Sequence, residues 1–274
     1  MAITTADGVI AGAIAGGAPV FINKGVTGNR TTSRIYSTWQ VTGVPGPGNM
    51  DTTLNGVVLD SSSAQVPGQI PFRHPGGGSK CYLGRLVMQN GLGGGLILAD
   101  RIWHNGGLSP TSIVAQNITT PTWPARDDLG GTDGVGVMVG LEVSATTGAG
   151  TPTLNLVYTS SDNNSSRNGF GTLGTSATTA AQTFFPIGLA QGDRGVKSIQ
   201  SFRLGSTWTS GTINLVAYRV IAMLPCGSAS IPAEINALTG AMIELHPGTV
   251  PFLLDLAPGN STTTMFGCLN YLHG

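Results

Sequence analysis

The sequence predicts an all-β protein, a jelly-roll-like antiparallel β-sandwich with two short helices and an N-terminal arm. Three observations lead to this class. Short segments alternate large apolar residues with small or polar ones, which is the period of two that a β-strand requires. Turns rich in glycine and proline separate these segments, and 42 of the 274 residues are glycine. Strand and helix patterns do not alternate along the chain, as they would in a parallel α/β sheet.

The N-terminal arm, residues 1–33, is predicted to contain the first helix. Thr4 and Asp7 resemble a weak capping box, and the apolar residues after them run to about Ile14 before Gly16 ends the pattern. A helix this short is marginal by itself. We therefore expect it to dock on another part of the protein.

The β-sandwich domain is predicted over residues 34–274. Its strand patterns occupy residues 34–41, 54–59, 81–89, 95–104, 134–144, 151–160, 196–204 and 212–224. Up to three further strands are expected after residue 240. Three pairs of neighbouring strands are expected to form two hairpins and a meander, namely 81–89 with 95–104, 196–204 with 212–224, and 134–144 with 151–160. Residues 212–224 are apolar on both faces, which predicts a central strand covered on both sides.

Two other segments complete the domain. Residues 228–240, SASIPAEINALTG, are predicted to form the second helix, with Ser230 as N-cap, Pro232 in the first turn and Gly240 after the end. Residues 105–133 form a polar loop of unusual length, and long loops are usually functional. We expect this loop to lie at an interface.

Residues 134–144, GVGVMVGLEVS, have one bulky face and one almost bare face. Five aliphatic residues fall on one side of the strand, whereas Gly136, Gly140 and Glu142 fall on the other. Glycine within a strand often marks close approach by another backbone or a ligand. The bare face is therefore expected to be packed rather than wet, and Glu142 to form a salt bridge or a subunit contact.

Charged residues are scarce, at 9% of the chain against roughly 25% in ordinary globular proteins. The 13 basic and 13 acidic residues cancel, and a protein with net charge near zero tends to associate. We expect much of the surface to be covered by copies of the chain or by partners. The basic residues are scattered, which argues against a nucleic-acid partner.

The sequence predicts neither a signal peptide nor a membrane span, because the apolar N-terminus lacks a basic region and contains Asp7. The three cysteines include no CxxC pair, so we expect buried, reduced thiols and assembly in a reducing cytoplasm.

No motif in the sequence predicts a catalytic, cofactor or metal site. The loop 126–134 contains Asp127, Asp128 and Asp133 but lacks the EF-hand spacing, so these are interpreted as solvated turn residues rather than Ca²⁺ ligands. The histidines are interpreted as isolated surface or loop residues, and they are His74, His104, His246 and His273.

A glycosidase needs two convergent carboxylates, and the sequence does not pair its candidates, which are Asp100, Glu142, Glu234, Glu244 and Asp255. Residues 75–80, PGGGSK, lack the order of a phosphate-binding loop, and no GxSxG motif occurs.

One segment carries a family resemblance. Residues 191–224, QGDRGVKSIQSFRLGSTWTSGTINLVAYRVIAML, resemble segments of tailed-bacteriophage virion structural proteins, and the rest of the chain is similar to them in composition. The resemblance implies a β-sandwich protein of the head, tail or fibres. A major capsid protein would carry a long charged helix, which this sequence lacks, so head-decoration, minor-capsid or fibre-associated proteins fit better.

From these observations we expect a non-enzymatic structural component of a virion, made and assembled in the host cytoplasm. It would decorate or stabilise the particle through packing against itself, as a homotrimer, and against other virion proteins. The alternative is a carbohydrate-binding adhesin or receptor-binding protein of a tail or fibre, with Trp123, Trp208 or Tyr158 as exposed platforms for sugar stacking. An enzyme such as a polysaccharide depolymerase ranks third.

Overall fold

The computed structural model describes residues 3–26, 30–173, 178–240 and 242–274. Its elements are α1 (Ala6–Ala15), β1 (Val20–Val26), β2 (Ile35–Ser37), β3 (Gly43–Val44), β4 (Val57–Val58), β5 (Cys81–Asn90), β6 (Gly94–His104), β7 (Gln116–Asn117), β8 (Val137–Ala145), β9 (Thr153–Ser160), β10 (Arg167–Thr172), β11 (Thr183–Pro186), β12 (Val196–Leu204), β13 (Thr212–Cys226), β14 (Ala233–Asn236), β15 (Glu244–Leu245), β16 (Pro251–Leu256) and β17 (Thr263–His273).

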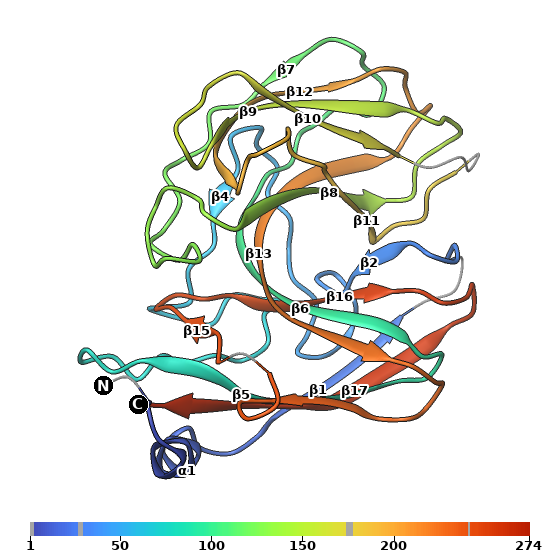
Figure 1. Ribbon diagram of the computed structural model, residues 1–274. Coiled ribbons are helices and arrows are strands. Elements are labelled where there is room, and N and C mark those ends of the chain that lie inside the picture. The colour runs from blue at the N-terminus through green and yellow to red at the C-terminus, as the bar shows by residue number, and fades with distance from the viewer. Residues whose placement is uncertain (1–2, 27–29, 174–177, 241) are drawn as a thin grey trace.

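The strands form a closed barrel between two open sheets (Figure 1). The barrel contains six strands in the order β13-β8-β11-β2-β16-β6, and β6 pairs with β13 to close it. A four-stranded sheet, β10-β9-β12-β7, lies on one side of the barrel, and we call it sheet C. On the other side lies sheet A, in the order β14-β5-β17-β1-β3, with α1 against it. The predicted antiparallel all-β class is confirmed, but the arrangement is a barrel between sheets and does not confirm a jelly roll.

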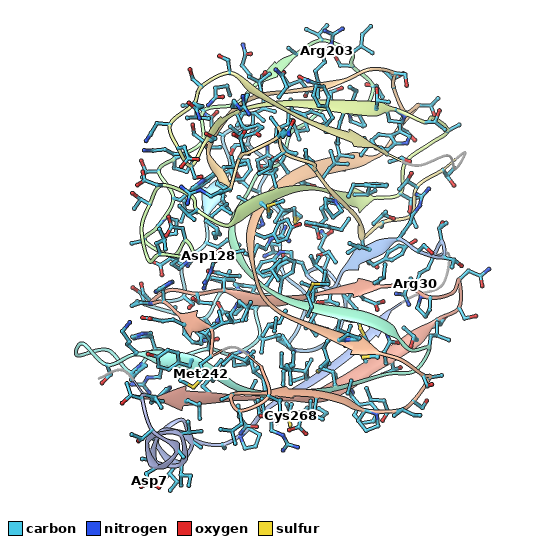
Figure 2. The ribbon with its side chains drawn as sticks, viewed as in Figure 1. Asp7, Arg30, Asp128, Arg203, Met242 and Cys268 are labelled. Atoms are coloured by element: carbon cyan, nitrogen blue, oxygen red, sulfur yellow. The ribbon has the colours of Figure 1, made fainter. Side chains whose placement is uncertain are left out.

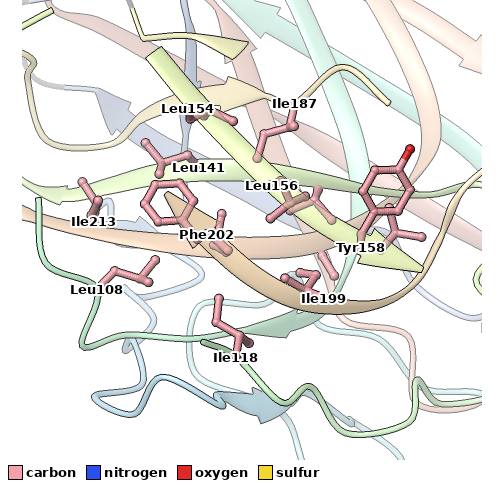
Figure 3. Close-up of a cluster of buried hydrophobic side chains, with 14 of the residues drawn as sticks. Leu108, Ile118, Leu141, Leu154, Leu156, Tyr158, Ile187, Ile199, Phe202 and Ile213 are labelled. Carbon is pink, nitrogen blue, oxygen red and sulfur yellow. The ribbon is translucent and has the colours of Figure 1, made fainter. Parts of the chain in front are cut away.

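Three apolar cores hold these layers together. The first lies between sheet C and the barrel, where Leu156 and Phe202 face Leu141 and Ile213 (Figure 3). The second lies between the barrel and sheet A, and the third fills the barrel itself. Strand β13 supplies side chains to all three cores. The prediction that this segment is a central strand covered on both sides is confirmed.

The predicted hairpins and meander are wrong, because neighbouring strands pass into different layers instead of pairing. Strand β5 belongs to sheet A and β6 to the barrel, although a short turn joins them. Likewise β12 lies in sheet C and β13 in the barrel, and β8 lies in the barrel and β9 in sheet C. Alternation along a strand shows which face is buried but does not identify the neighbouring strand.

The second predicted helix is also wrong. Residues Ala233–Asn236 form the edge strand β14, which pairs with β5 from Ala233↔Met88 to Asn236↔Arg85. Ser230, the expected N-cap, has a left-handed φ of 60° that does not begin a helix. Pairing with the edge of sheet A therefore outweighs the short helical pattern.

The first helix is confirmed, with a different cap. Thr5, not Thr4, is the N-cap, and its Oγ1 accepts a hydrogen bond of 3.0 Å from the Gly8 N–H. The helix docks on β17, as expected for an element too short to persist alone. Residues Val20–Val26, in the segment expected to be an arm, form strand β1 of sheet A.

The bare face of β8 lines the inside of the barrel. A side chain on Gly140 would overlap the ring of Phe184, and one on Gly136 would overlap the carboxylate of Asp128. The missing Cβ of Gly140 thus makes room for an aromatic ring in the barrel. This face is packed, as the sequence indicates, and it is packed by the chain itself.

Candidate functional site

The barrel encloses both members of an ion pair. Arg101 on β6 donates a hydrogen bond of 2.6 Å to Glu142 on β8, and both side chains are fully buried. The guanidinium also lies 4.6 Å from the centre of the Trp39 ring and donates to His104 Nδ1 over 3.1 Å. Burial and, to a smaller extent, the Arg101 charge lower the pKa of His104 to about 2. His104 is therefore a neutral, buried acceptor, and its interpretation as a surface or loop residue is wrong.

Much of the remaining charge is buried too. Asp255 pairs with Arg30, and Asp100 pairs with Arg126 over 3.2 Å. Lys24 is buried with no carboxylate partner among the described residues and donates to two backbone carbonyls, and burial lowers its pKa to about 8. Nine of the 26 charged residues are buried, which leaves 17 for the surface. The residues buried in this way are Lys24, Arg30, Asp100, Arg101, Arg126, Asp127, Glu142, Arg219 and Asp255.

Each of the five candidate carboxylates has a basic partner. Asp100, Glu142 and Asp255 belong to the three buried pairs described above. At the surface, Glu234 pairs with Arg85 over 2.8 Å and Glu244 with Lys80 over 2.5 Å. The structure does not bring two of them together as the acid and base of a glycosidase.

Asp127 organises the loop that the sequence suggested as a Ca²⁺ candidate. Its carboxylate accepts four backbone N–H groups over 2.7–3.2 Å, those of Leu129, Gly131, Gly134 and Val135. Asp128 pairs with Arg219 and Asp133 with Lys197. Asp127 is thus buried and structural, and its interpretation as a solvated residue is wrong. Among the described residues, no group of three or more His, Cys, Asp or Glu has a metal-binding arrangement.

The proposed sugar-stacking residues are buried. Trp123, Trp208 and Tyr158 all lie in the core between sheet C and the barrel, and Trp123 donates to the Val196 carbonyl over 2.7 Å. Sequence patterns placed both tryptophans in loops, but loop residues that close a core are buried like strand residues. The prediction that they form an exposed platform is wrong.

Several hollows lie at the surface, and two of them flank features that the sequence singled out. A cleft of about 850 Å³ is lined by residues 61–65, His74 and the glycines of residues 75–80, together with the Lys80–Glu244 pair. A groove of about 670 Å³ crosses the outer face of sheet C and is lined by Phe170, Asn155 and Arg203. The Phe170 side chain in this groove is 62% exposed.

Large apolar side chains are exposed on the side of the molecule opposite the groove of sheet C. Ile10 and Ile14 of α1 are 62% and 80% exposed, and Phe21 and Phe266 are exposed on β1 and β17 of sheet A. Leu238, in the turn after β14, is 78% exposed. Asp7 of α1 and Cys268 of β17 mark this side in Figure 2, whereas Arg203 marks the far end.

All three cysteines are free, and two of them are buried as expected. Cys81 and Cys226 are buried, and Cys268 is half-buried on sheet A. Burial raises the pKa of the Cys81 thiol to about 12, so it is an inert core residue. None of the described helices is long and apolar enough to cross a membrane.

Comparisons with known proteins add little. No family model matches the chain, and no curated protein matches its sequence significantly. Among solved structures, the infectious bursal disease virus VP2 subviral particle aligns with 93% of this chain and 81% of its own, at 11% identity and a TM-score of 0.18. A TM-score this low establishes neither a shared fold nor a shared function.

Proposed function

We propose that the chain is a structural subunit of a virus particle, of the tailed-phage head-decoration, minor-capsid or fibre-associated kind. It works by packing against copies of itself, with three as the proposed number, and against other particle proteins. It carries out no catalysis, and it joins the particle in the host cytoplasm.

One observation carries this proposal, the scarcity of charge at the surface. An ordinary chain of this length has roughly 70 charged residues, most of them exposed. This chain leaves 17 for the surface, while Ile10, Ile14, Phe21, Phe266 and Leu238 project from one side. Such a surface favours association through apolar burial, at about 25 cal/mol per Å². The resemblance of residues 191–224 to phage structural proteins supports the same role.

The test is to purify particles from the virus that encodes the chain and to locate the chain by mass spectrometry and electron microscopy. We expect the chain in every particle at a fixed, symmetric position. Particles that lack it, or that contain it in variable trace amounts, would contradict the proposal.

A second candidate function, carbohydrate binding, is favoured by the groove on sheet C. The exposed Phe170 ring offers an apolar face to a sugar, and the neighbouring Asn155 and Arg203 side chains offer hydrogen bonds to hydroxyl groups. Phe170→Ala should abolish signals on a glycan array. The matched control is Leu129→Ala, which removes an apolar side chain that is 78% exposed and lies outside this groove, and it should leave the signals unchanged.

A further inference from the structure

Helix α1 has an unusual orientation, because its small residues face the protein and its large ones face outwards. Gly12 and Gly16 lie directly on β17, where side chains at these positions would contact His273 and overlap the carbonyl oxygen of Tyr271. On the outer side, Ile10 and Ile14 stand one helical turn apart. A surface helix normally buries its large apolar residues against its own core. This helix instead leaves Ile10 and Ile14 exposed, where they can contact another surface.

The exposed side chain of Leu238 and a surface groove lie side by side next to this helix. A groove of about 390 Å³ runs between α1 and the end of β14, lined by Val9, Ala13 and Leu272 among others. Leu238 stands at the rim of the groove in a rigid turn, because the Asn236 side chain accepts hydrogen bonds from the N–H groups of residues 238 and 239 over 3.0 and 3.1 Å. An apolar projection thus adjoins a partly apolar hollow that could receive an identical projection.

The charges beside the groove are also self-complementary. Arg85 and Glu234 line it and are 2.8 Å apart, with both side chains partly exposed. When two such surfaces meet, each Arg85 can face a Glu234 of the other copy. Anionic membranes would instead require basic residues on the polar flank of the helix, and α1 has none in its last turn and Asp7 in its first.

We propose that this surface, which we call the α1 face, binds the α1 face of a second copy of the chain. It comprises Ile10, Ile14 and Leu238 with the adjoining groove, together with Phe21 and Phe266, which are exposed on β1 and β17 of the same sheet. These five side chains expose on the order of 600 Å² if a fully exposed one offers about 200 Å². A stable interface buries about 800 Å² per partner, so the apolar area of the α1 face is most of what such an interface needs. Two identical faces in contact are related by a twofold axis, so this contact joins pairs of copies and is separate from the contacts within a trimer. The inference rests on the proposed role as an assembly subunit and assigns part of that role to a surface.

The first test compares matched variants by sedimentation velocity of the full chain. Leu238→Glu should raise the dissociation constant of the oligomer at least tenfold, as should Ile14→Glu. Leu129→Glu is the control, because Leu129 is also 78% exposed but lies in the loop organised by Asp127. All three positions are exposed, so the variants should keep the wild-type circular-dichroism spectrum and melting temperature.

The second test shows whether the partner is a copy of the chain. Arg85→Glu gives an α1 face with two acidic residues, and Glu234→Arg gives one with two basic residues. Each variant alone should associate at least tenfold more weakly than wild type, and an equimolar mixture of the two should recover association.

The outcomes separate this inference from the proposed function. If wild type associates and the Leu238, Ile14 and Leu129 variants associate equally well, association does not use the α1 face. The proposed assembly role then stands, through another surface. If the mixture of charge variants does not recover association, contact between two α1 faces is wrong. If wild type stays monomeric at all concentrations, both proposals fail.

Discussion

Buried charge distinguishes this protein at the scale of single residues. Arg101 is held by Glu142, by His104 and by the rings of Trp39 and Phe252. Such a pair contributes little net stability compared with apolar residues of the same volume, because both charges lose their hydration. Removing one partner is costly, because the other charge then stays buried alone.

Glu142→Gln should therefore destabilise the protein by about 3–5 kcal/mol, since it leaves the Arg101 charge without its counter-ion. The double variant Arg101→Met with Glu142→Leu should lose much less than the sum of the two single variants. Urea unfolding followed by fluorescence measures each value. Additive losses would show that the two side chains do not interact energetically.

His104 should make the protein sensitive to mild acid. The unfolded chain binds a proton at this residue below the ordinary pKa of 6.5, whereas the folded chain does not until about pH 2, so falling pH favours the unfolded state. Between pH 7 and pH 5, wild type should lose about 2 kcal/mol more stability than His104→Gln, which keeps an acceptor for Arg101. Equal losses in urea titrations at the two pH values would indicate that His104 titrates normally in the folded state.

The sequence predicted some of these residue roles and missed others. The position of Glu142 on the bare face of a strand predicted a salt bridge as one of two alternatives, and the structure shows that bridge. The role of Asp127 was not predictable, because its four donors belong to a loop whose path depends on the rest of the fold. Likewise, the patterns around Trp123 and Trp208 indicated loops but not the core that these loops close.

At the scale of elements, long strands serve more than one layer. Strand β13 pairs with β8 and β6 along its length and contributes to the cores on both sides of the barrel as well as inside it. Its two apolar faces predicted this position. The sequence did not predict which sheet the strands next to β13 in the chain would join. Alternating patterns are equally compatible with a local hairpin and with a strand that passes into another sheet.

Gly140 provides a test of the barrel packing. Gly140→Ala on β8 should destabilise the protein by about 1–3 kcal/mol, because its Cβ would overlap the Phe184 ring. Gly25→Ala on β1 is the control, since nothing lies within 4 Å of the position that its Cβ would occupy. Thermal unfolding should show a lower melting temperature for the first variant and no loss for the second. Equal melting temperatures would mean that Phe184 moves aside freely.

At the scale of the whole molecule, the distribution of charge and apolar surface matters more than any single site. Nine charged residues lie inside, and five of the exposed large apolar residues lie on α1, on β1 and β17 of sheet A and in the turn after β14. The composition alone predicted a covered surface but could not locate it. The α1 face became recognisable only when the structure placed Gly12 and Gly16 of the helix against β17.

Association through such a surface should depend weakly on simple salt. Raising sodium chloride from 50 to 500 mM screens exposed charges but leaves apolar burial in place, so the dissociation constant should change less than about threefold. Ammonium sulfate should strengthen association, because sulfate favours burial of apolar surface. Light scattering across a salt series measures both effects. Dissociation in 500 mM sodium chloride would show that charge pairs hold the copies together.

If other copies cover the charge-poor surface of this protein, the purified chain must associate with itself in solution. Sedimentation velocity of the purified wild-type chain, from below 1 to about 50 micromolar, tests it most directly. We expect a concentration-dependent shift to a discrete oligomer of defined stoichiometry. A single monomeric species at every concentration, soluble and stable over days, would contradict it.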